Sequence, residues 1–286
     1  MRLMATDLPA GPARPARNGT VSVGPRVRAW RQSRGLSQFD LAMRAGFSSR
    51  HLSFIETGRT RPSREAVLVL AEALDMPLRE RNRLLESAGF AHVYRETPLT
   101  AEEMTQVRGL LQVILDRQLP YSAVCIDRHS TCLIGNRAAG QLLSLVAAPS
   151  LLTKNANFLR VVFHPEGVRR WIVNWPDVES HLLRRAEREL GAADDAVGQA
   201  LLAEIRRYCP APEATRDAAA PLAGRVHAHD LLLPIHIRQA DVDLRLYSTI
   251  MTLGTAHDVT LQELRIETFF PADDASERCW ARLFTP

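Results

Sequence analysis

Hydrophobic positions between residues 25 and 90 recur with a helical period, and turn-forming residues interrupt them at short intervals. Serines stand where helices would begin, and glycines stand where helices would end. The pattern predicts five short helices: one from Pro25, then Gln38–Ala45 and Ser49–Thr57, then one after Ser63 and one after Pro77. Five such helices would form a compact all-α domain.

The apolar stripes of these helices predict the core of this domain. The side chains expected to point inward are Val27, Trp30, Phe39, Leu41, Ala42, Leu52, Ile55, Val67, Leu70, Ala71, Leu74, Leu84, Leu85 and Ala88.

The pattern changes after a short linker that contains Pro98. A helix is expected over 101–117, a β-hairpin over 122–127 and 131–136, and helices over 137–146, 168–190 and 194–207. The apolar run 157–163 fits either a helix or a strand. Three strands are expected over 231–238, 244–253 and 261–270. A hairpin, then helices, then a three-strand meander is the order of an α+β domain with an antiparallel sheet.

The expected organisation therefore has two folded parts and three connecting or terminal segments. In chain order these are a flexible arm (1–24), the five-helix domain (25–93), a linker with a connecting helix (94–118), the α+β domain (119–272) and a C-terminal tail (273–286).

Charge is distributed unevenly along the 286 residues. Residues 1–95 hold sixteen arginines, no lysine and eight acidic residues, a net charge of +8, whereas the remainder carries −4. A basic first part indicates a polyanionic partner. The chain has no apolar run long enough for a membrane span and no secretory signal, so a cytoplasmic location with reduced cysteines is expected.

The segment 37–63, SQFDLAMRAGFSSRHLSFIETGRTRPS, has two short helices joined by a tight turn that contains Gly46. This arrangement lets the second helix project into a DNA major groove. From Arg26 to Leu74 the sequence resembles the helix-turn-helix domain of phage repressor and Cro proteins. The resemblance implies double-stranded operator DNA as the partner. It also implies an ion pair between Arg31 and Glu56 inside the domain.

The same resemblance assigns DNA contacts. Gln38 is expected to contact a phosphate, and Ser48 caps the recognition helix, which Ser49 and Arg50 open toward base edges. Phe54 could contact a thymine methyl group or pack within the domain. The loop arginines Arg59, Arg61 and Arg64 are expected at phosphates or in the minor groove.

Three further segments make the second part resemble the MmyB-like transcription regulators. They are LPYSAVCIDRHSTCLIGNRAAGQLL, NANFLRVVFHPEGVRRWIVNW and VESHLLRRAERELG. The resemblance covers nearly all of residues 25–270. It implies a PAS-like domain whose antiparallel sheet has helices packed on one side, enclosing a cavity for a small apolar, fatty-acid-like effector. No other cofactor is expected.

Aromatic and polar side chains of this region are the candidates to line such a cavity. They are Tyr121, Asn136, Phe158, Phe163, His164, Trp171 and Trp175. Each aromatic side chain could instead be ordinary core, and Asn136 and Asn157 could serve only as helix N-caps.

Other chemistries have weaker signals. His227, His229 and His236 with Asp230 could form a metal site, but no cysteine lies near them in the sequence, and none is expected. Cys125 and Cys132 could face each other across the hairpin as a redox pair. The sequence has no catalytic motif that would indicate an enzyme.

Taken together, the sequence predicts a homodimeric, ligand-responsive, DNA-binding regulator. Two alternatives remain: the second domain could be a dimerisation or docking module without an effector, or the cysteines could make the protein a redox sensor.

Overall fold

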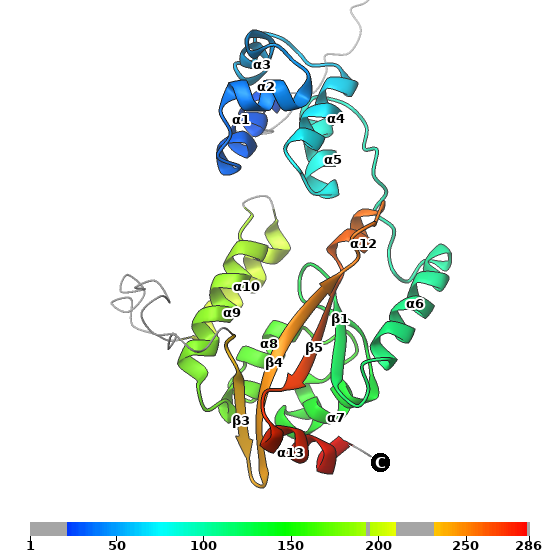
Figure 1. Cartoon of the computed structure of the whole chain (residues 1–286), viewed down its shortest axis with the longest axis vertical. Helices are drawn as coiled ribbons and strands as arrows, with labels where there is room; N and C mark the ends of the chain where they lie inside the picture. Colours follow the sequence, from blue (N-terminus) through cyan, green and yellow to red (C-terminus); the bar gives the residue numbers. More distant parts are fainter. Residues whose placement is uncertain (1–21, 193–194, 210–231, 285–286) are drawn as a thin grey trace, which may run out of the picture. The chain divides into compact units, whose positions relative to one another are not determined.

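The computed structural model describes residues 22–192, 195–209 and 232–284 and divides into two compact units, Met1–Arg95 and Glu96–Pro286 (Figure 1). Residues 1–21 of the expected arm lie outside the described residues. So do His227, His229 and the first residue of the strand expected from 231.

Unit 1 consists of five helices, as predicted. They are α1 (Val23–Ser33), α2 (Gln38–Ala45), α3 (Ser49–Glu56), α4 (Arg64–Ala73) and α5 (Leu78–Ser87). The first helix begins two residues before Pro25, because proline is tolerated in a first turn, where the amides have no intrahelical partner.

Local side-chain chemistry determines where α2 and α3 begin and end. The Ser37 hydroxyl accepts a hydrogen bond from the Asp40 amide, and the Asp40 carboxylate accepts one from the Ser37 amide in return. Gly46 ends α2 in the left-handed conformation, with φ of 68°, which a glycine adopts without strain. Ser48 then caps α3 by accepting from the His51 amide at 3.1 Å.

The core of unit 1 matches the prediction except at one position on α2. Leu41 and Ala42 are buried, but Phe39 is 63% exposed and the neighbouring Met43 is 65% exposed. Two residues along a helix differ by about 200° around its axis, so Phe39 lies on the face opposite to Leu41. The assignment of Phe39 to the core was therefore wrong.

Unit 2 contains a five-stranded antiparallel sheet with the strand order β2-β1-β5-β4-β3. The strands are β1 (Ser122–Ile126), β2 (Cys132–Gly135), β3 (Ile235–Gln239), β4 (Val242–Thr252) and β5 (Arg265–Pro271). The predicted hairpin and the predicted meander are both present, and β5 joins them by pairing with β1. Leu261 falls in a short helix, α12 (Val259–Glu263), so the last strand begins later than expected.

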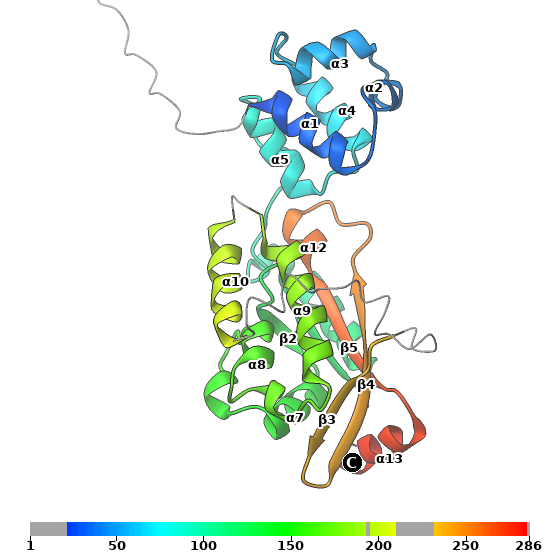
Figure 2. The same cartoon turned by 90° about the vertical axis from the view of Figure 1, so that its left-hand side faces the viewer.

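Helices α7 (Arg137–Val146), α8 (Phe158–Phe163), α9 (Trp175–Leu190) and α10 (Ala196–Tyr208) follow the hairpin. Figures 1 and 2 show α8, α9 and α10 on the same side of the sheet. The apolar run 157–163, which fitted either a helix or a strand, forms helix α8. The helix expected over 168–190 is divided into a 3-10 turn (Val168–Trp171) and α9, because Pro176 lies in a first helical turn.

Helix α6 (Thr105–Asp116), expected as a connector, belongs to unit 2. Its fully buried Leu111 and Leu115 pack against Ala123 and Cys125, on the face of the sheet opposite to α7, α8 and α9. The sheet is therefore covered on both faces, not on one side as the family resemblance implied.

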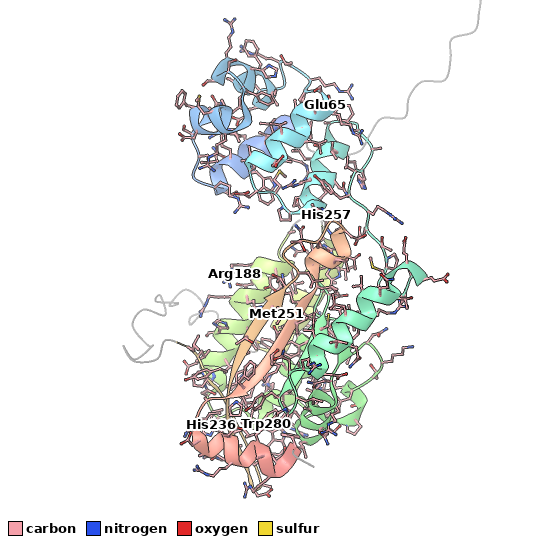
Figure 3. The ribbon with its side chains drawn as sticks, turned by 45° about the vertical axis from the view of Figure 1, so that its right-hand side comes forward. Glu65, Arg188, His236, Met251, His257 and Trp280 are labelled. Carbon is pink, nitrogen blue, oxygen red and sulfur yellow. The ribbon has the colours of Figure 1, made fainter. Side chains whose placement is uncertain are left out.

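The segment expected as a C-terminal tail is instead helix α13 (Asp274–Phe284), which packs against β4 and β5. Its Trp280, labelled in Figure 3, is fully buried and donates from Nε1 to the Pro120 carbonyl at 3.0 Å. Cys279, Trp280, Leu283 and Phe284 form a helical apolar stripe, and a stripe of this kind becomes stable only when it is packed.

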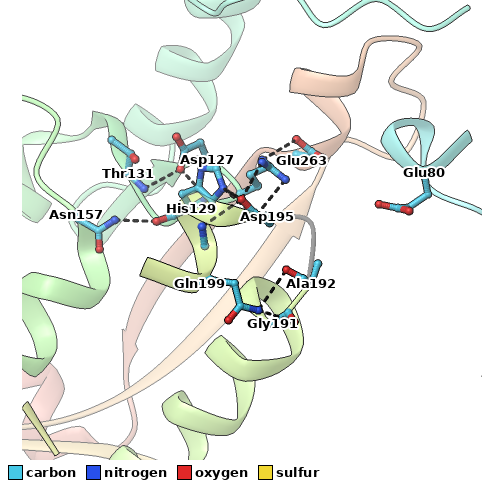
Figure 4. A network of polar contacts seen from close by, with 12 residues as sticks. Glu80, Asp127, His129, Thr131, Asn157, Gly191, Ala192, Asp195, Gln199 and Glu263 are labelled. Atoms are coloured by element: carbon cyan, nitrogen blue, oxygen red, sulfur yellow. Dashed lines mark hydrogen bonds and ion pairs between the residues drawn. The ribbon is translucent and has the colours of Figure 1, made fainter. Parts of the chain in front are cut away.

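Polar contacts attach the start of α10 to the β1–β2 turn (Figure 4). Asp195 caps α10 by accepting from the Gly198 amide, and its carboxylate also contacts His129 Nε2 at 3.0 Å. Arg128 reaches the same carboxylate at 3.3 Å. Asp127 holds the turn itself by accepting from the amides of His129 and Thr131. The Asp195 cap therefore also fixes α10 relative to the hairpin.

Candidate functional site

A buried polar cluster fixes the relative positions of α1, α2 and α3. Arg31 donates from Nε and Nη2 to the two carboxylate oxygens of Glu56, at 2.7 and 3.0 Å, and from Nη1 to the Leu36 carbonyl. Gln38 Nε2 donates to the same carboxylate at 2.8 Å. Burial alone would raise the pKa of Glu56, but the bonds from Arg31 and Gln38 outweigh it and hold this pKa below its usual value. The expected ion pair is present.

This cluster gives Gln38 an intramolecular role that the sequence did not predict. One N–H of its amide is occupied by Glu56, so the predicted phosphate contact would have to use the second N–H or the backbone amide.

The exposed face of α3 displays the other predicted base-reading residues. Ser49 and Arg50 are exposed in the first turn. Phe54 is half-buried one turn later, and its ring lies beneath two guanidinium groups, with Arg50 at 5.4 Å and Arg59 at 5.8 Å from the ring centroid. Such cation–π contacts pre-position both arginines. Phe54 thus packs at the surface and supports the two cations beside it.

The three loop arginines differ in their surroundings. Arg59 and Arg64 are exposed, and Arg64 is the first residue of α4. Arg61 is exposed as well, and it donates to the Ala88 carbonyl at 2.8 Å, at the end of α5. A cation there complements the helix dipole and satisfies a terminal carbonyl, so Arg61 has a structural role.

Unit 2 has a partly open cavity of about 70 Å³ between the sheet and its helices. Alternating strand residues reach it, because the pleat brings every second side chain to one face: Ser122 and Val124 of β1, Glu267 and Phe269 of β5, and Leu246 and Ser248 of β4. The remaining lining is mostly aliphatic. It comprises Cys132, Ala139, Leu142, Leu143, Val146, Phe158, Val162, Val168, Ile172, Val178, Leu182, Arg185, Ile235 and Ile237.

Of the seven predicted ligand residues, only Phe158 lines this cavity. Tyr121 packs against Phe270 and Trp280, and its hydroxyl contacts Glu277 at 3.0 Å. Asn136 is the N-cap of α7, and its side chain also bonds the backbone of Ala123, Leu115 and Tyr121. For Asn136 the open alternative, an N-cap, is the one the structure shows, and Asn157 likewise caps α8.

The other four predicted residues lie around α8 and the start of α9. Phe163 is fully buried in a separate cluster and stacks edge-on against Trp175. His164 ends α8 and stacks on Tyr208, while Trp171 lies beneath Arg170. Aromatic residues were chosen as cavity walls, but large aromatic rings in a small domain more often fill the core, as these do.

One end of the cavity carries a buried ion pair. Arg185 of α9 places Nη1 2.5 Å from Glu267 Oε1, and the two side chains are 14% and 2% exposed. Arg185 Nε also contacts Glu189 at 3.0 Å, and Glu189 in turn pairs with Arg265 at 2.6 Å. Burial raises the pKa of Glu267 above its usual value, although the Arg185 charge opposes this shift.

Sequence reasoning missed this pair, although both residues carried a signal. Glu267 is a charged residue inside the apolar strand segment IETFF. Arg185 continues the stripe of Val178 and Leu182 at helical spacing, which places it on the buried face of α9.

The cysteines do not form the redox pair considered from the sequence. Strand pairing sets Cys125 opposite Ile134 and Cys132 opposite Ile126. Cys125 packs beneath α6, whereas Cys132 lines the cavity on the other face. Burial raises the pKa of each thiol to about 12, and nearby carboxylates contribute. Both thiols therefore stay protonated and unreactive at neutral pH.

His236, the one residue of the considered metal site that is described, contacts Asp243 at 2.7 Å across the β3–β4 hairpin. Within the ranges that the structure describes, no group of three histidine, cysteine or acidic side chains could hold a metal ion.

Comparison with protein families now decides the classification. Residues 107–283, more than half of the chain, match the family described as the MmyB-like transcription regulator ligand binding domain. The chain belongs to this family. Residues 22–84 match a helix-turn-helix domain family, which covers α1 to α4 and most of α5 of this MmyB-like regulator. This match and the observed α2–α3 geometry agree with the predicted helix-turn-helix.

Curated relatives are similar over a limited part of the chain. Uncharacterised HTH-type transcriptional regulators of Mycobacterium bovis and Mycobacterium tuberculosis are each 34% identical over 97 residues. This match spans 34% of the chain and 38% of each relative's length.

Two solved structures are also similar. The restriction-modification controller protein C.AhdI from Aeromonas hydrophila is 37% identical over 21% of this chain and 89% of its own, with a TM-score of 0.20. An RNA-binding light-oxygen-voltage receptor is 13% identical over 90% of this chain and 62% of its own, with a TM-score of 0.25. Neither likeness is close enough to support a conclusion about this chain.

Among the described residues, no helix is both long enough and apolar enough to cross a membrane.

Proposed function

We propose that this protein is a cytoplasmic regulator that binds operator DNA through α3 and responds to a small apolar molecule held in the unit 2 cavity. The observation that carries the proposal is the combination of two features: an exposed, arginine-bearing α3 face in one unit and an apolar cavity in a domain of the MmyB-like family.

The DNA-reading surface comprises Ser49, Arg50 and Phe54, with Arg59 and Arg64 at its edge. Arg50 can donate two hydrogen bonds to the N7 and O6 acceptors of a guanine. Arg59 and Arg64 would contact phosphates, which adds affinity without sequence preference. Gln38 and the N-terminus of α2 would contact a phosphate as well.

The cavity limits which effector fits. Its volume is about 70 Å³ and its lining is mostly aliphatic, which favours a compact apolar molecule. The lining supports a compact apolar molecule as the effector that fits the cavity as it stands.

A homodimer is part of the proposal, and one half of β4 supports it. Beyond Leu246 no described residue pairs with the outer edge of β4, and residues 248–252 are exposed on both faces of the strand. This stretch carries no charge, yet it includes Ile250 and Met251, the latter labelled in Figure 3. Exposed uncharged edges are rare in single chains. An antiparallel pair of identical edges closes on a two-fold axis, the symmetry that helix-turn-helix dimers share with their operators.

Native mass spectrometry of the purified full-length protein, followed by solvent extraction, tests the effector half of this proposal. The expected result is a dimer that releases a discrete small apolar molecule. If the dimer carries nothing and no small apolar probe binds it, the alternative of a docking module without an effector replaces the proposal.

A further inference from the structure

The polar end of the cavity has a charge balance that restricts the ligand. Among the described residues that line the cavity, Arg185 and Glu267 are the only charged ones, and they pair with each other. Continuing outward, Glu189 and Arg265 complete an alternating series of two cations and two anions. The series is therefore neutral, and no positive charge is left over for an anionic ligand.

Adding a carboxylate to this site would be unfavourable. The second anion would lie in an apolar cavity beside Glu267, and a buried unpaired charge carries a large desolvation cost. An ammonium group would meet Arg185 and be opposed for the same reason. A neutral hydroxyl has no such cost, because it can accept from a guanidinium and donate to a carboxylate at the same time.

We propose that the Arg185–Glu267 pair selects a neutral effector, an apolar body with one hydroxyl-like group that both donates and accepts, and excludes carboxylic acids. This inference rests on the proposed function and adds the ligand's class. Ser122 and Ser248 line the same cavity and add neutral hydrogen-bonding groups without changing its charge.

A matched series of probes tests the selection. Binding of 1-hexanol, hexanoate and hexylamine to the full-length protein at pH 7.5 would be measured by ligand-observed NMR. Hexanol is expected to bind at least tenfold more tightly than either charged probe. A preference for hexanoate in the wild-type protein would overturn the proposal, whatever any variant does.

Glu267→Gln supplies the second arm. This change keeps the shape of the side chain but removes its charge, so the series gains a net positive charge at Arg185. Hexanoate should then bind at least tenfold more tightly than it binds the wild type. If hexanoate binding does not change, the pair is structural only and the proposal fails.

Ala139→Leu separates this failure from failure of the proposed function. Ala139 lines the cavity on α7 and carries no charge, so the larger side chain should fill the space and weaken all three probes equally. If the wild type binds none of the probes, the cavity is not a ligand site, and the proposed function falls together with the inference. If it binds them all with equal affinity, the cavity binds ligands but the charge selection is wrong.

Discussion

At the scale of single residues, the arginines of unit 1 differ in the groups that they contact, and this difference does not follow their order in the sequence. Arg31 is buried against Glu56, and the exposed Arg61 donates to the Ala88 carbonyl. Arg50 and Arg59 are exposed, and both contact the Phe54 ring. The sequence predicted a basic DNA-binding region, but it could not show which cations are already committed, because their partners lie 25 or more residues away in the chain.

Replacing Arg50 by alanine should remove sequence preference at one base pair of the operator. Loss of a bidentate arginine–guanine contact costs about 1–3 kcal/mol at that position and leaves the others unchanged. Arg44→Ala, at an exposed arginine of α2, is the matched control for loss of charge. Operator selection from a random DNA library, followed by binding titrations, measures both variants. The same base preference in Arg50→Ala and wild type would remove Arg50 from the base readers.

The Glu56 cluster makes the stability of unit 1 depend on pH. The pKa of Glu56 in the folded state lies below its unfolded value of about 4.3. The stability that ionised Glu56 gives the folded unit is therefore present above a pH of about 4.3 and is lost as the pH falls through the folded pKa. Glu56→Gln should lower the opening free energy of α1–α3 at pH 7 by about 3 kcal/mol, since it leaves Arg31 buried without its counter-charge.

Hydrogen exchange of the α1–α3 amides at pH 7 and at pH 4 measures this effect in the full chain. The difference in opening free energy between wild type and Glu56→Gln should shrink at the lower pH. Glu72→Gln changes an exposed residue of α4 and should match the wild type at both pH values. A pH-independent difference would contradict the assigned role of this carboxylate.

None of the four cysteines forms a disulfide, and three of them are buried. With the pKa of Cys125 and of Cys132 raised to about 12, a thiol reagent at pH 7.5 should label fewer than one thiol per folded chain and all four in denaturant. Rapid labelling of Cys132 in the folded protein would restore the redox-sensor alternative.

At the scale of elements, hydrophobic periodicity predicted the five helices, the hairpin and the meander. It failed where a contact distant in sequence decides the outcome. Helix α6 looked like a connector until Leu111 and Leu115 were found beneath the sheet. Helix α13 looked like a tail because its stripe is short, and only its packing against β4 and β5 makes it part of the fold. The assignment of Phe39 to the core was a different kind of error. The helical period alone places Phe39 on the face opposite to Leu41, so the sequence could have excluded it.

The uncharged half of β4 leads to a prediction about assembly. Ile250→Lys places a charge on the proposed pairing edge and should weaken the dimer at least tenfold, as judged by sedimentation velocity over a concentration series. Val197→Lys is the control, because Val197 is also an exposed apolar residue and lies on α10, away from this edge. If both variants keep the wild-type dimerisation constant, the dimer forms elsewhere. If the protein is monomeric and the amides of residues 248–252 are protected from hydrogen exchange, another segment of the same chain covers the strand.

At the scale of the whole molecule, the family and the two-domain organisation were readable from sequence, while the cavity was not. Short motifs in α2 and α3 suffice to indicate a helix-turn-helix, because local spacing sets the geometry of that motif. The cavity is lined by residues of nine elements, and no local pattern distinguishes them from ordinary core residues. Its charged pair joins α9 to β5, which are 82 residues apart at Arg185 and Glu267.

The central claim is that occupancy of the unit 2 cavity changes operator binding by unit 1. A fluorescence-anisotropy titration of the selected operator tests it directly, using full-length wild type and Ala139→Leu, each with its co-purifying molecules retained or extracted. The account predicts that extraction changes the wild-type Kd at least fivefold, the lower range of allosteric coupling, and leaves the filled-cavity variant unchanged. Equal Kd values in all four samples, with operator binding intact, would contradict the account.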